Sequence, residues 1–539
     1  MSHQTLHNYV HEAHLNDASR PALYVAGRAW SYEELRNGQR AIGEFLTARG
    51  IAGQQTVGVL ANKSMLVYQS LLGIMERGNI YVPMAPKFPA ARLAQIADQA
   101  ELKAIIVENA SVEKAAELLQ QCRSELLVLL PQAKELPESL IPLQRHNFVV
   151  GEADAAALRP GGVLFNTRGE HYAYLLFTSG STGLPKGVPV THANACACIE
   201  AVQKRFPLVA SDRVAHFAEL TFDISIGEMF LTWKAGACLY APQMSELMVP
   251  SEFVRRHELT VWSSVPTLAN NMRAVGALKP GSLPSVRLSL FCGEPLSREL
   301  ADAWTKAATA STTVNLYGPT EASIFATSYV YDGSSTTNIV PLGVGLDQMQ
   351  CRVVDETNHD VAADAVGELL LAGPQVVSGY WENPEATARA FQTLSGDRGG
   401  RVWYHTGDLV SVSKEWGLLF HGRKDRQIKM RGYRIELMEI ESVLKHVTGA
   451  EAAAAVPIHQ GDGRYEQIIA YCNRINLDEA SIKVQCGAHL PDYMVPLRIV
   501  GLAALPTNDN GKIDYRALAS RAEQDLAAGK ALRGRPSPK

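Results

Sequence analysis

The amino-acid sequence predicts an α/β protein built on parallel sheets. Short apolar runs such as TVGVL (56–60), KAIIVE (103–108) and YAYLLFT (172–178) have the length and composition of buried strands. Segments with helical apolar periodicity lie between them, for example AARLAQIADQAE from residue 90. Strands that alternate with helices are typical of α/β layers, in which helices cover parallel sheets.

A chain of 539 residues is too long for one hydrophobic core, since such cores stop growing near ~250–300 residues. Residues 340–425 are strand-like and punctuated by glycine, which indicates a β-rich part. The clearest boundary is GRKD (422–425), and RIELMEIESVLKHV beyond it predicts an amphipathic helix that opens a small α/β unit. We therefore expect a large N-terminal lobe (1–424) with two layered α/β subdomains and a β-rich subdomain, a small C-terminal α/β domain (425–518) and a flexible tail (519–539).

The composition is that of an ordinary globular protein, with 46% apolar and 20% charged residues. A net charge of −4, from 51 basic and 55 acidic residues, gives no general attraction to nucleic acid or to an acidic membrane. The N-terminus lacks the apolar core of a signal peptide, and no apolar run reaches the ~18 residues that a bilayer requires. The eight cysteines lack zinc-site spacing, so we expect buried, reduced thiols in a cytoplasmic protein.

The segment LLFTSGSTGLPKGV (175–188) carries the clearest chemical signal. A buried strand leads into a loop of Thr, Ser and Gly with one Lys, followed by a helix-like segment. Glycines let backbone N–H groups approach phosphate oxygens, while the hydroxyls and the Lys add donors and charge. Pro185 stands where a Walker A pattern needs Gly, which excludes a P-loop phosphotransferase. The residues alone indicate a polyphosphate-binding loop of another kind, with a surface Gly/Ser turn as the alternative.

This loop resembles the signature loop of the adenylate-forming superfamily, which comprises acyl-CoA synthetases, luciferases and nonribosomal-peptide adenylation domains. Further segments resemble motifs of the adenylation domains and follow that family's order: WSYEEL (30–35), YVPMAPKFPAARL (81–93), FDIS (222–225), NLYGPTE (315–321), GELLLAGPQVVSGYW (367–381), YHTGDL (404–409), GRKDRQIKMRGYRIELMEIE (422–441), LPDYMVP (490–496) and NGKIDYRAL (510–518). The resemblance implies that a substrate carboxylate attacks the α-phosphate of ATP and releases pyrophosphate. His405 departs from the pattern, because many relatives carry Arg there.

By this resemblance the cofactors are ATP and Mg²⁺. Glu321 matches the magnesium carboxylate, Thr320 matches a residue that contacts the α-phosphate, and Lys186 matches a lysine that holds the β- and γ-phosphates. The loop residues would hold the same phosphates, Asn315, Tyr317, Gly293 and Glu294 would line adenine, and Asp408 and Arg423 would bind ribose. The full expected ATP site also comprises Thr178, Ser179, Gly180, Ser181, Thr182, Gly183 and Gly318.

Lys512 in NGKID is the residue of the C-terminal domain that the resemblance identifies as catalytic. It would bridge the carboxylate, the ribose oxygen and the α-phosphate as negative charge develops. The local sequence alone favours a solvated turn lysine after NDNG. In the family the small domain then swings about a hinge, which Asp425 matches. This motion removes the lysine and brings the loop at Gly432 to the site, which opens a path for a pantetheine thiol.

Asp223 in FDIS indicates the substrate class. By resemblance it pairs with an amino-acid ammonium, whereas a helix N-cap is the alternative from the local sequence. The remaining pocket residues by the same register are mostly apolar, which disfavours a charged substrate side chain. They comprise Ile224, Gly227, Ser263, Leu290, Cys292, Leu316, Ile324 and Phe325. Part of this set is similar to pockets for cysteine, serine or glycine, and FCGEPL (291–296) resembles D-alanine-activating ligases, so we expect a small neutral amino acid.

These features identify the chain as similar to a free-standing, monomeric adenylation enzyme that acts in nonribosomal peptide or related biosynthesis. The expected acceptor is the phosphopantetheine thiol of a separate carrier protein. The alternatives are a D-alanine–carrier protein ligase of cell-wall modification, an acyl-CoA ligase and a nucleotide-binding module without turnover. Asp223 and NGKIDYRAL disfavour the acyl-CoA ligase, and the intact set of matched residues disfavours the inactive module.

Overall fold

The computed structural model describes residues 4–151, 165–180, 185–394, 400–459, 465–508 and 512–533. The chain forms two compact units, which are described separately. The first unit comprises Met1–Pro86, Leu93–Phe177 and Lys186–Lys424. The second unit comprises Asp425–Lys539 together with two short segments from earlier in the chain, Lys87–Arg92 and Thr178–Pro185.

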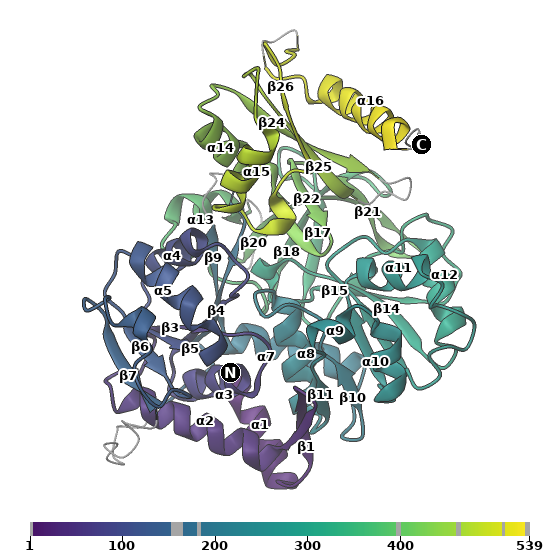
Figure 1. Ribbon diagram of the computed structural model, residues 1–539. Coiled ribbons are helices and arrows are strands. Elements are labelled where there is room, and N and C mark those ends of the chain that lie inside the picture. Colours follow the sequence, from purple (N-terminus) through teal and green to yellow (C-terminus); the bar gives the residue numbers. More distant parts are fainter. Residues whose placement is uncertain are drawn as a thin grey trace, which may run out of the picture. The chain divides into compact units, whose positions relative to one another are not determined.

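The first unit contains a sheet whose seven described strands run in the order β7-β6-β5-β3-β4-β8-β9 (Figure 1). The pairings from β7 to β8 are parallel, and every residue of β3, β4 and β5 is buried. This burial explains why these strands read as continuous apolar runs. The strands are β3 (Thr56–Leu60), β4 (Ile80–Met84), β5 (Ala104–Val107), β6 (Leu127–Leu130), β7 (Asn147–Val150), β8 (Tyr172–Thr178) and β9 (Lys186–Thr191).

A second sheet of the first unit has nine described strands in the order β16-β15-β14-β13-β12-β10-β11-β1-β2. Its central strands are parallel, and antiparallel strands close both edges. The strands are β1 (Pro21–Val25), β2 (Arg28–Ser31), β10 (Arg213–Ala215), β11 (Cys238–Tyr240), β12 (Val261–Ser264), β13 (Leu288–Phe291), β14 (Thr312–Tyr317), β15 (Thr327–Tyr331) and β16 (Val344–Gly345).

Most of the helices that precede residue 424 cover these two sheets. Apolar residues of α1, α2, α3, α7 and α8 form one large core with residues of both sheets. Helices α10, α11 and α12 pack on the nine-stranded sheet around Trp262 and Trp304, which form a separate core (Figure 1). The helices are α1 (Leu6–Asn16), α2 (Tyr32–Thr47), α3 (Met65–Glu76), α4 (Ala90–Gln99), α5 (Val112–Gln121), α7 (His192–Arg205), α8 (Asp223–Lys234), α9 (Met244–Leu247), α10 (Pro250–Arg256), α11 (Pro266–Ala274), α12 (Arg298–Ala307) and α13 (Pro384–Ala390).

A third, antiparallel sheet completes the first unit. Its strands run in the order β17-β18-β20-β19, and β21 pairs with β20. This sheet is the β-rich part that the glycine-punctuated segment predicts. Its strands are β17 (Gln350–Val354), β18 (Gly367–Ala372), β19 (Phe391–Thr393), β20 (Val402–Ser413) and β21 (Gly417–Arg423).

The second unit opens with a hairpin and continues as a three-stranded sheet with helices. Strand β25 lies between β24 and β26 in this sheet. Two apolar cores hold the unit together, one around α14 and α15 and one beneath α16. The elements are β22 (Gln427–Met430), β23 (Tyr433–Glu436), α14 (Leu437–Thr448), β24 (Ala453–His459), β25 (Tyr465–Cys472), α15 (Glu479–Gly487), β26 (Arg498–Gly501) and α16 (Tyr515–Arg533).

The predicted fold class is confirmed, since two layered α/β parts, a β-rich sheet and a smaller C-terminal α/β unit are all present. Two local predictions differ from the structure. A strand, β9, follows the phosphate loop where a helix-like segment was expected, because Val188 and Val190 alternate and are buried. The helix α7 begins only at His192, where Thr191 and Asn194 form a capping box.

The second difference lies in the second unit. The hairpin β22–β23 precedes α14, so the first residues of RIELMEIESVLKHV are in a strand and the helix begins at Leu437. Residues 519–533, which were expected in a flexible tail, belong to α16. Leu518 and Ala522 of this helix are buried with Tyr471 of β25, so an apolar stripe fixes the helix on the sheet.

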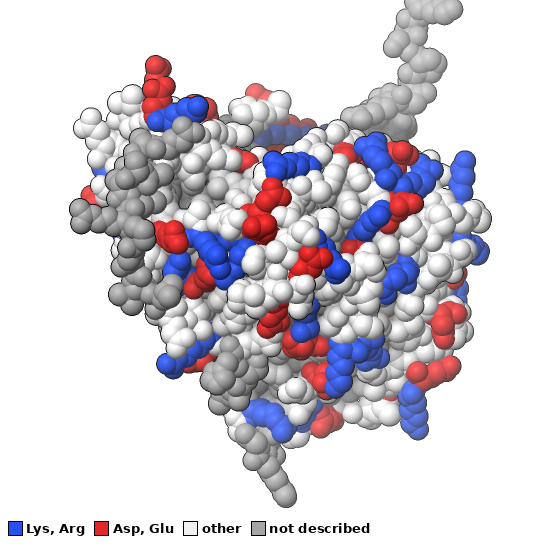
Figure 2. Space-filling model, turned by 90° about the horizontal axis from the view of Figure 1, so that it is seen from below, with Lys and Arg blue, Asp and Glu red and all other residues white. Residues whose placement is uncertain are grey.

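All eight cysteines are free thiols, as expected, and all except the half-buried Cys351 are buried. Burial raises the pKa of seven of these thiols: Cys122, Cys196, Cys198, Cys238, Cys351, Cys472 and Cys486. On the face of the molecule in Figure 2, Lys and Arg side chains lie interspersed with Asp and Glu. Within the described ranges, no helix combines the length and apolar character that crossing a membrane requires.

Candidate active site

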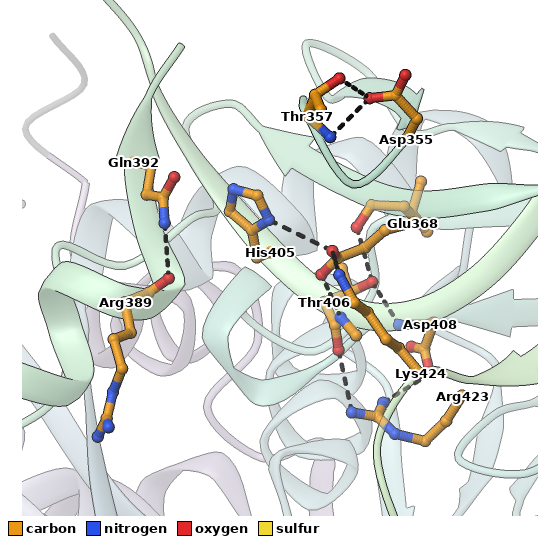
Figure 3. Close-up of polar contacts among 12 residues, drawn as sticks. Asp355, Thr357, Glu368, Arg389, Gln392, His405, Thr406, Asp408, Arg423 and Lys424 are labelled. Carbon is orange, nitrogen blue, oxygen red and sulfur yellow. Dashed lines mark hydrogen bonds and ion pairs between the residues drawn. The ribbon is translucent and has the colours of Figure 1, made fainter. Parts of the chain in front are cut away.

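Asp408 anchors one corner of the site in the first unit. It lies on β20 with Arg423 of β21 opposite it in register, and Arg423 Nη1 donates to Asp408 Oδ1 at 2.6 Å (Figure 3). Tyr317 Oη donates to Oδ2 at 2.5 Å, and Asp408 is only 1% exposed. Burial and the Asp408 carboxylate raise the pKa of Tyr317 well above its ordinary value, so this phenol remains a neutral donor. The structure thus brings together both expected ribose ligands and an expected adenine-side residue.

The side chain of His405 lies near Glu368, close to Asp408 in the sequence. Its Nδ1 lies 3.6 Å from Glu368 Oε2, and Lys424 Nζ lies 3.5 Å from the same oxygen (Figure 3). The other oxygen of Glu368 accepts a hydrogen bond from the backbone N–H of Gly407 at 3.1 Å. His405 therefore helps to hold the carboxylate that fixes the backbone next to Asp408.

The expected adenine-side residues are held by backbone contacts. Asn315 Nδ2 donates to the carbonyl oxygens of Val340 and Pro341 at 3.2 and 2.9 Å, so the orientation of its buried amide is fixed. Glu294 accepts a hydrogen bond from the backbone N–H of Thr267 at 2.8 Å, in the first turn of α11. The carboxylate of Glu294 therefore stabilises a helix N-terminus, in addition to any contact with a nucleotide.

A close backbone contact requires glycine at position 318. A methyl group on Gly318 would lie 2.4 Å from the carbonyl oxygen of Ile324. The turn that makes this contact has Ser323 and Ile324 in the left-handed region, at φ 51° and 80°. Such a backbone is unfavourable for a β-branched residue and costs on the order of 1–3 kcal/mol. Two hydrogen bonds hold the turn, from Ser323 Oγ to Gln375 O at 2.6 Å and from the Ala326 N–H to Tyr317 O at 2.7 Å.

Glu321 lies in the 3₁₀ turn η3 (Thr320–Ala322), directly after β14. It is 1% exposed, and Tyr380 Oη donates to its Oε1 at 2.8 Å. Lys186, the first residue of β9, has its Nζ 5.6 Å from the centre of the Tyr380 ring. A cation at this distance is attracted by an aromatic face. Tyr380 thus contacts both the expected magnesium carboxylate and the expected phosphate lysine, and Thr320 is half-buried beside them.

Tyr380 is a residue whose role the sequence does not reveal. It lies within the quoted motif at 367–381, but 59 residues separate it from Glu321. A Gly-Tyr-Trp sequence gives no sign of what its hydroxyl binds. Only the packing of the loop after β18 against η3 brings the two side chains together.

Part of the phosphate loop belongs to the second unit. Ser179 Oγ donates to the carbonyl oxygen of Arg434 at 2.8 Å and accepts a hydrogen bond from the backbone N–H of Glu436 at 3.2 Å. Both partners lie on β23. Thr178 ends β8, and Gly180 is buried. The remaining expected loop residues, Ser181, Thr182 and Gly183, lie outside the described residues.

The expected amino-acid pocket gathers around the start of α8. Asp223 is the first residue of this helix and is 8% exposed. The N-cap is Phe222, so the alternative interpretation of Asp223 as the N-cap is wrong. Burial and the nearby Asp223 carboxylate both raise the pKa of Tyr174 and of Cys198. The first turn of a helix is a favourable position for a negative charge.

Close contacts join several expected pocket residues. A methyl group on Gly227 would lie 2.9 Å from Cε2 of Phe325 and 3.2 Å from Cγ2 of Ile324. A methyl group on Gly293 would lie 3.2 Å from Cδ1 of Ile224. Side chains from α8, from the turn after η3 and from the loop after β13 therefore meet. Four further buried pocket residues come from β12, β13, β14 and the loop after β13: Ser263, Leu290, Leu316 and Cys292.

A buried ionisable pair lies next to this pocket. Glu228, on α8, has Oε2 2.7 Å from Nδ1 of His216, which follows β10. Burial raises the pKa of Glu228 to about 8 and lowers the pKa of His216 well below its ordinary value. Ser263 is hydrogen-bonded to Glu228, and Lys63 Nζ donates to the carbonyl oxygen of His216 at 2.6 Å. The sequence signal of this pair is weak, because Glu228 is one of several polar residues in a largely buried helix.

Lys512, in the second unit, is exposed. Its backbone N–H donates to Oδ1 of Asn508 at 3.1 Å, its carbonyl oxygen accepts from the Asn508 N–H at 2.8 Å, and a β-bridge joins Thr507 to Ile513. These contacts fix the backbone of Lys512 against Asn508. Asp425, the expected hinge residue, is also exposed, and its Oδ1 accepts from the Gln427 N–H at 3.2 Å.

Comparison with known proteins finds relatives over most of the chain. The family model described as AMP-binding enzyme matches residues 11–381. Phosphinothricin tripeptide synthetase PhsC of Streptomyces viridochromogenes is 31% identical over 521 residues, which are 96% of this chain and 45% of that protein. Bacitracin synthase 3 of Bacillus licheniformis is 30% identical over 503 residues, which are 93% of this chain and 7% of that protein. The chain thus spans less than half the length of these synthases.

Other relatives match along their full length. The D-alanine--D-alanyl carrier protein ligase of Lacticaseibacillus rhamnosus is 28% identical over 516 residues, which are 93% of this chain and 96% of that protein. Among solved structures, the Vibrio cholerae adenylation domain AlmE in complex with glycyl-adenosine-5'-phosphate superposes with a TM-score of 0.85 at 29% identity. This match covers 97% of this chain and 98% of that one.

Proposed function

This chain belongs to the AMP-binding enzyme family and is an adenylate-forming ligase of the nonribosomal-peptide adenylation type, and we propose that it activates a small neutral amino acid. The amino-acid carboxylate attacks the α-phosphate of ATP, which forms the aminoacyl-adenylate and releases pyrophosphate. The phosphopantetheine thiol of a carrier protein then takes the aminoacyl group and releases AMP. The observation that carries the proposal is the buried Asp223 carboxylate among apolar pocket residues.

The nucleotide is assigned to the corner around Asp408. This carboxylate would accept hydrogen bonds from the ribose hydroxyls, with Arg423 beside it. Asn315 donates through Nδ2 to two backbone carbonyls, which leaves its amide oxygen as the acceptor for the exocyclic amine of adenine. Tyr317, held by its hydroxyl, would offer its ring for stacking.

A magnesium ion fits the chemistry of Glu321. This carboxylate is buried and its orientation is fixed by Tyr380, and Mg²⁺ prefers oxygen ligands with few of them from the protein. In the ranges that the structure describes, no three His, Cys, Asp or Glu residues cluster as a metal site, so phosphate oxygens and water would supply the other ligands. The bound ion would neutralise phosphate charge. Lys186 would hold the terminal phosphates, and Lys512 would bind the α-phosphate and the attacking carboxylate.

The pocket supports an amino acid as the acyl substrate. A carboxylate among apolar side chains favours a cationic group beside it, and the ammonium of an amino acid supplies one. Fatty and aryl acids carry no such group. The other pocket residues are uncharged, so a second charge on the substrate would lie among groups that cannot pair with it.

The contacts of Gly227 favour a small substrate. Phe325 and Ile324 approach Gly227 so closely that a methyl group there would meet both, which limits the depth of the pocket. AlmE, the structural relative, carries a glycyl-adenylate. D-alanine is the second candidate, because the segment at 291–296 resembles D-alanine ligases and one such ligase matches this chain along its length.

Pyrophosphate exchange with each common L- and D-amino acid tests the proposal. We expect glycine or another small neutral amino acid to give the strongest exchange. Asp223→Asn should lower kcat/KM for that substrate by roughly 10²–10³-fold, the usual cost of removing one partner of a buried charge pair. A preference for lysine, glutamate or a long fatty acid would contradict the pocket assignment.

Glycolic acid provides a matched substrate control, since a hydroxyl replaces the ammonium of glycine. The wild-type protein should strongly prefer glycine, and Asp223→Asn should lose most of that preference. For the second half-reaction, radiolabelled aminoacyl transfer is measured to a phosphopantetheinylated carrier protein and to coenzyme A. Transfer to coenzyme A alone would favour an acyl-CoA ligase.

A further inference from the structure

The residues that follow β18 connect several parts of the candidate site. We call residues 373–381 the bracket segment. Its backbone binds η3, the turn after η3, α7 and the start of β9. The hydrogen bonds run from Val377 N to Glu321 O at 3.0 Å, from Ser323 Oγ to Gln375 O at 2.6 Å, from Asn194 Nδ2 to Pro374 O at 2.7 Å, and from Trp381 N to Gly187 O at 2.8 Å. The segment therefore fixes the distance between Glu321 and the strand that begins with Lys186.

Tyr380 is the residue of the bracket segment that reaches both of these groups. Its hydroxyl donates to Glu321 Oε1 at 2.8 Å, and Lys186 Nζ lies 5.6 Å from its ring centre. The position of the ring is itself determined, because the Tyr380 N–H donates to Thr387 Oγ1 at 2.9 Å and the ring packs edge-on against Phe391 at 5.6 Å between centres. A hydrogen bond to a carboxylate is among the stronger ones in proteins.

We propose that Tyr380 is a positioning residue that aligns Glu321 for the metal–nucleotide complex and holds Lys186 toward the terminal phosphates. This inference rests on the proposed ATP-dependent function. The hydroxyl fixes one carboxylate oxygen and so orients the other, and the ring attracts the ammonium group. Residues that orient a metal ligand typically contribute 10–100-fold to metal affinity.

Two substitutions separate the two contacts. Tyr380→Phe removes the hydroxyl and keeps the ring over Lys186, whereas Tyr380→Leu removes both. Tyr331→Phe is the matched control, because Tyr331 Oη donates to Asp302 Oδ1 at 2.6 Å and neither residue is assigned to the site. All three variants are purified as the full chain and compared with wild type by thermal denaturation.

The direct readout is Mn²⁺ binding, followed by electron paramagnetic resonance in the presence of α,β-methylene-ATP. We expect Tyr380→Phe to raise the Kd for Mn²⁺ about 10–100-fold and Tyr331→Phe to change it less than about twofold. Without metal, Tyr380→Leu should bind the nucleotide less tightly than Tyr380→Phe, since only the former loses the ring beside Lys186. Equal Mn²⁺ affinity in wild type and Tyr380→Phe would overturn the inference.

The dependence of pyrophosphate exchange on Mg²⁺ distinguishes positioning from a general loss of structure. The kcat of Tyr380→Phe should recover toward the wild-type value at saturating Mg²⁺, whereas a structural defect would lower kcat at every concentration. Failure of the proposed function would be seen differently, as a wild-type protein that shows no amino-acid-dependent exchange. Normal wild-type exchange with an unchanged Mg²⁺ profile in Tyr380→Phe would reject only the role of Tyr380.

Discussion

The two units of the molecule present their expected site residues in opposite ways. In the first unit Asp408 and Glu321 are buried and hydrogen-bonded to neighbouring side chains. In the second unit Lys512 is exposed, and its backbone is hydrogen-bonded to Asn508. Buried groups of this kind are pre-oriented by packing, so the same contacts serve stability and function. An exposed lysine contributes little to stability, so its proposed role is tested by activity instead.

The largest effect that this comparison predicts is on the stability of the first unit. Arg423→Met removes the partner of the Asp408 carboxylate, which is almost fully buried. Leaving one charge of a buried pair without its partner typically costs about 3–5 kcal/mol. We expect a loss of this size in the free energy of unfolding, measured by urea denaturation, together with weaker ATP binding. An unfolding free energy within ~1 kcal/mol of wild type would show that this corner is not pre-oriented by packing.

Lys512→Ala should show the opposite pattern. Because the side chain is exposed, the free energy of unfolding should change by less than about 0.5 kcal/mol. Pyrophosphate exchange should fall about 10²–10³-fold, the usual cost of removing one group that stabilises developing charge. Thioester formation from a supplied aminoacyl-adenylate should be largely retained. An equal loss in both half-reactions would contradict the assignment of the lysine to adenylation alone.

A smaller effect concerns the buried pair of Glu228 and His216 in the first unit. In the folded protein burial raises the pKa of Glu228 to about 8 and keeps His216 neutral. In the unfolded chain the corresponding values are 4.5 for Glu228 and 6.5 for His216. Just below pH 6.5 the folded state holds a proton on Glu228 and the unfolded state holds one on His216, so the contribution of the pair to stability changes little. Between pH 6.5 and 8 only the folded state keeps the proton, and stability therefore falls as the pH rises.

Each pH unit in this range changes the free energy of unfolding by ~1.4 kcal/mol per proton, so the pair should account for roughly 2 kcal/mol between pH 6.5 and 8. Glu228→Gln removes the ionisation and keeps a hydrogen-bonding side chain. Urea denaturation of both proteins at several pH values gives the difference. We expect wild type to lose stability relative to Glu228→Gln over this range. A constant difference would show that Glu228 is ionised in the folded protein.

Much of the fold could be predicted because its strands are buried on both faces and read as continuous apolar runs. TVGVL is β3, and YAYLLFT is β8. The helical segment from residue 90 is α4. The prediction failed for residues 186–191, where a short sequence is compatible with several structures. The buried side chains of Val188 and Val190 decide the outcome there, and their burial depends on neighbours that are distant in the sequence.

The candidate site likewise contains residues that could be recognised from the sequence and residues that could not. Asp223, Glu321 and Asp408 could be recognised because each lies in a short local motif, and the structure buries all three. Tyr380 and His216 could not, because their roles come from partners on other elements. The expected adenine residue Glu294 shows a further limit, since its carboxylate also binds the start of α11. A local motif identifies a residue but does not reveal everything that the residue contacts.

The burial of the native thiols allows dyes to be attached selectively to introduced cysteines. The thiolate is the form that reacts with maleimide dyes, so seven thiols with raised pKa values should label slowly. A cysteine placed at Val275, 81% exposed on the first unit, or at Val484, 76% exposed on the second, would react far faster. Two such positions would carry a fluorophore pair on an otherwise native chain, and energy transfer between the dyes would show whether their separation changes during turnover.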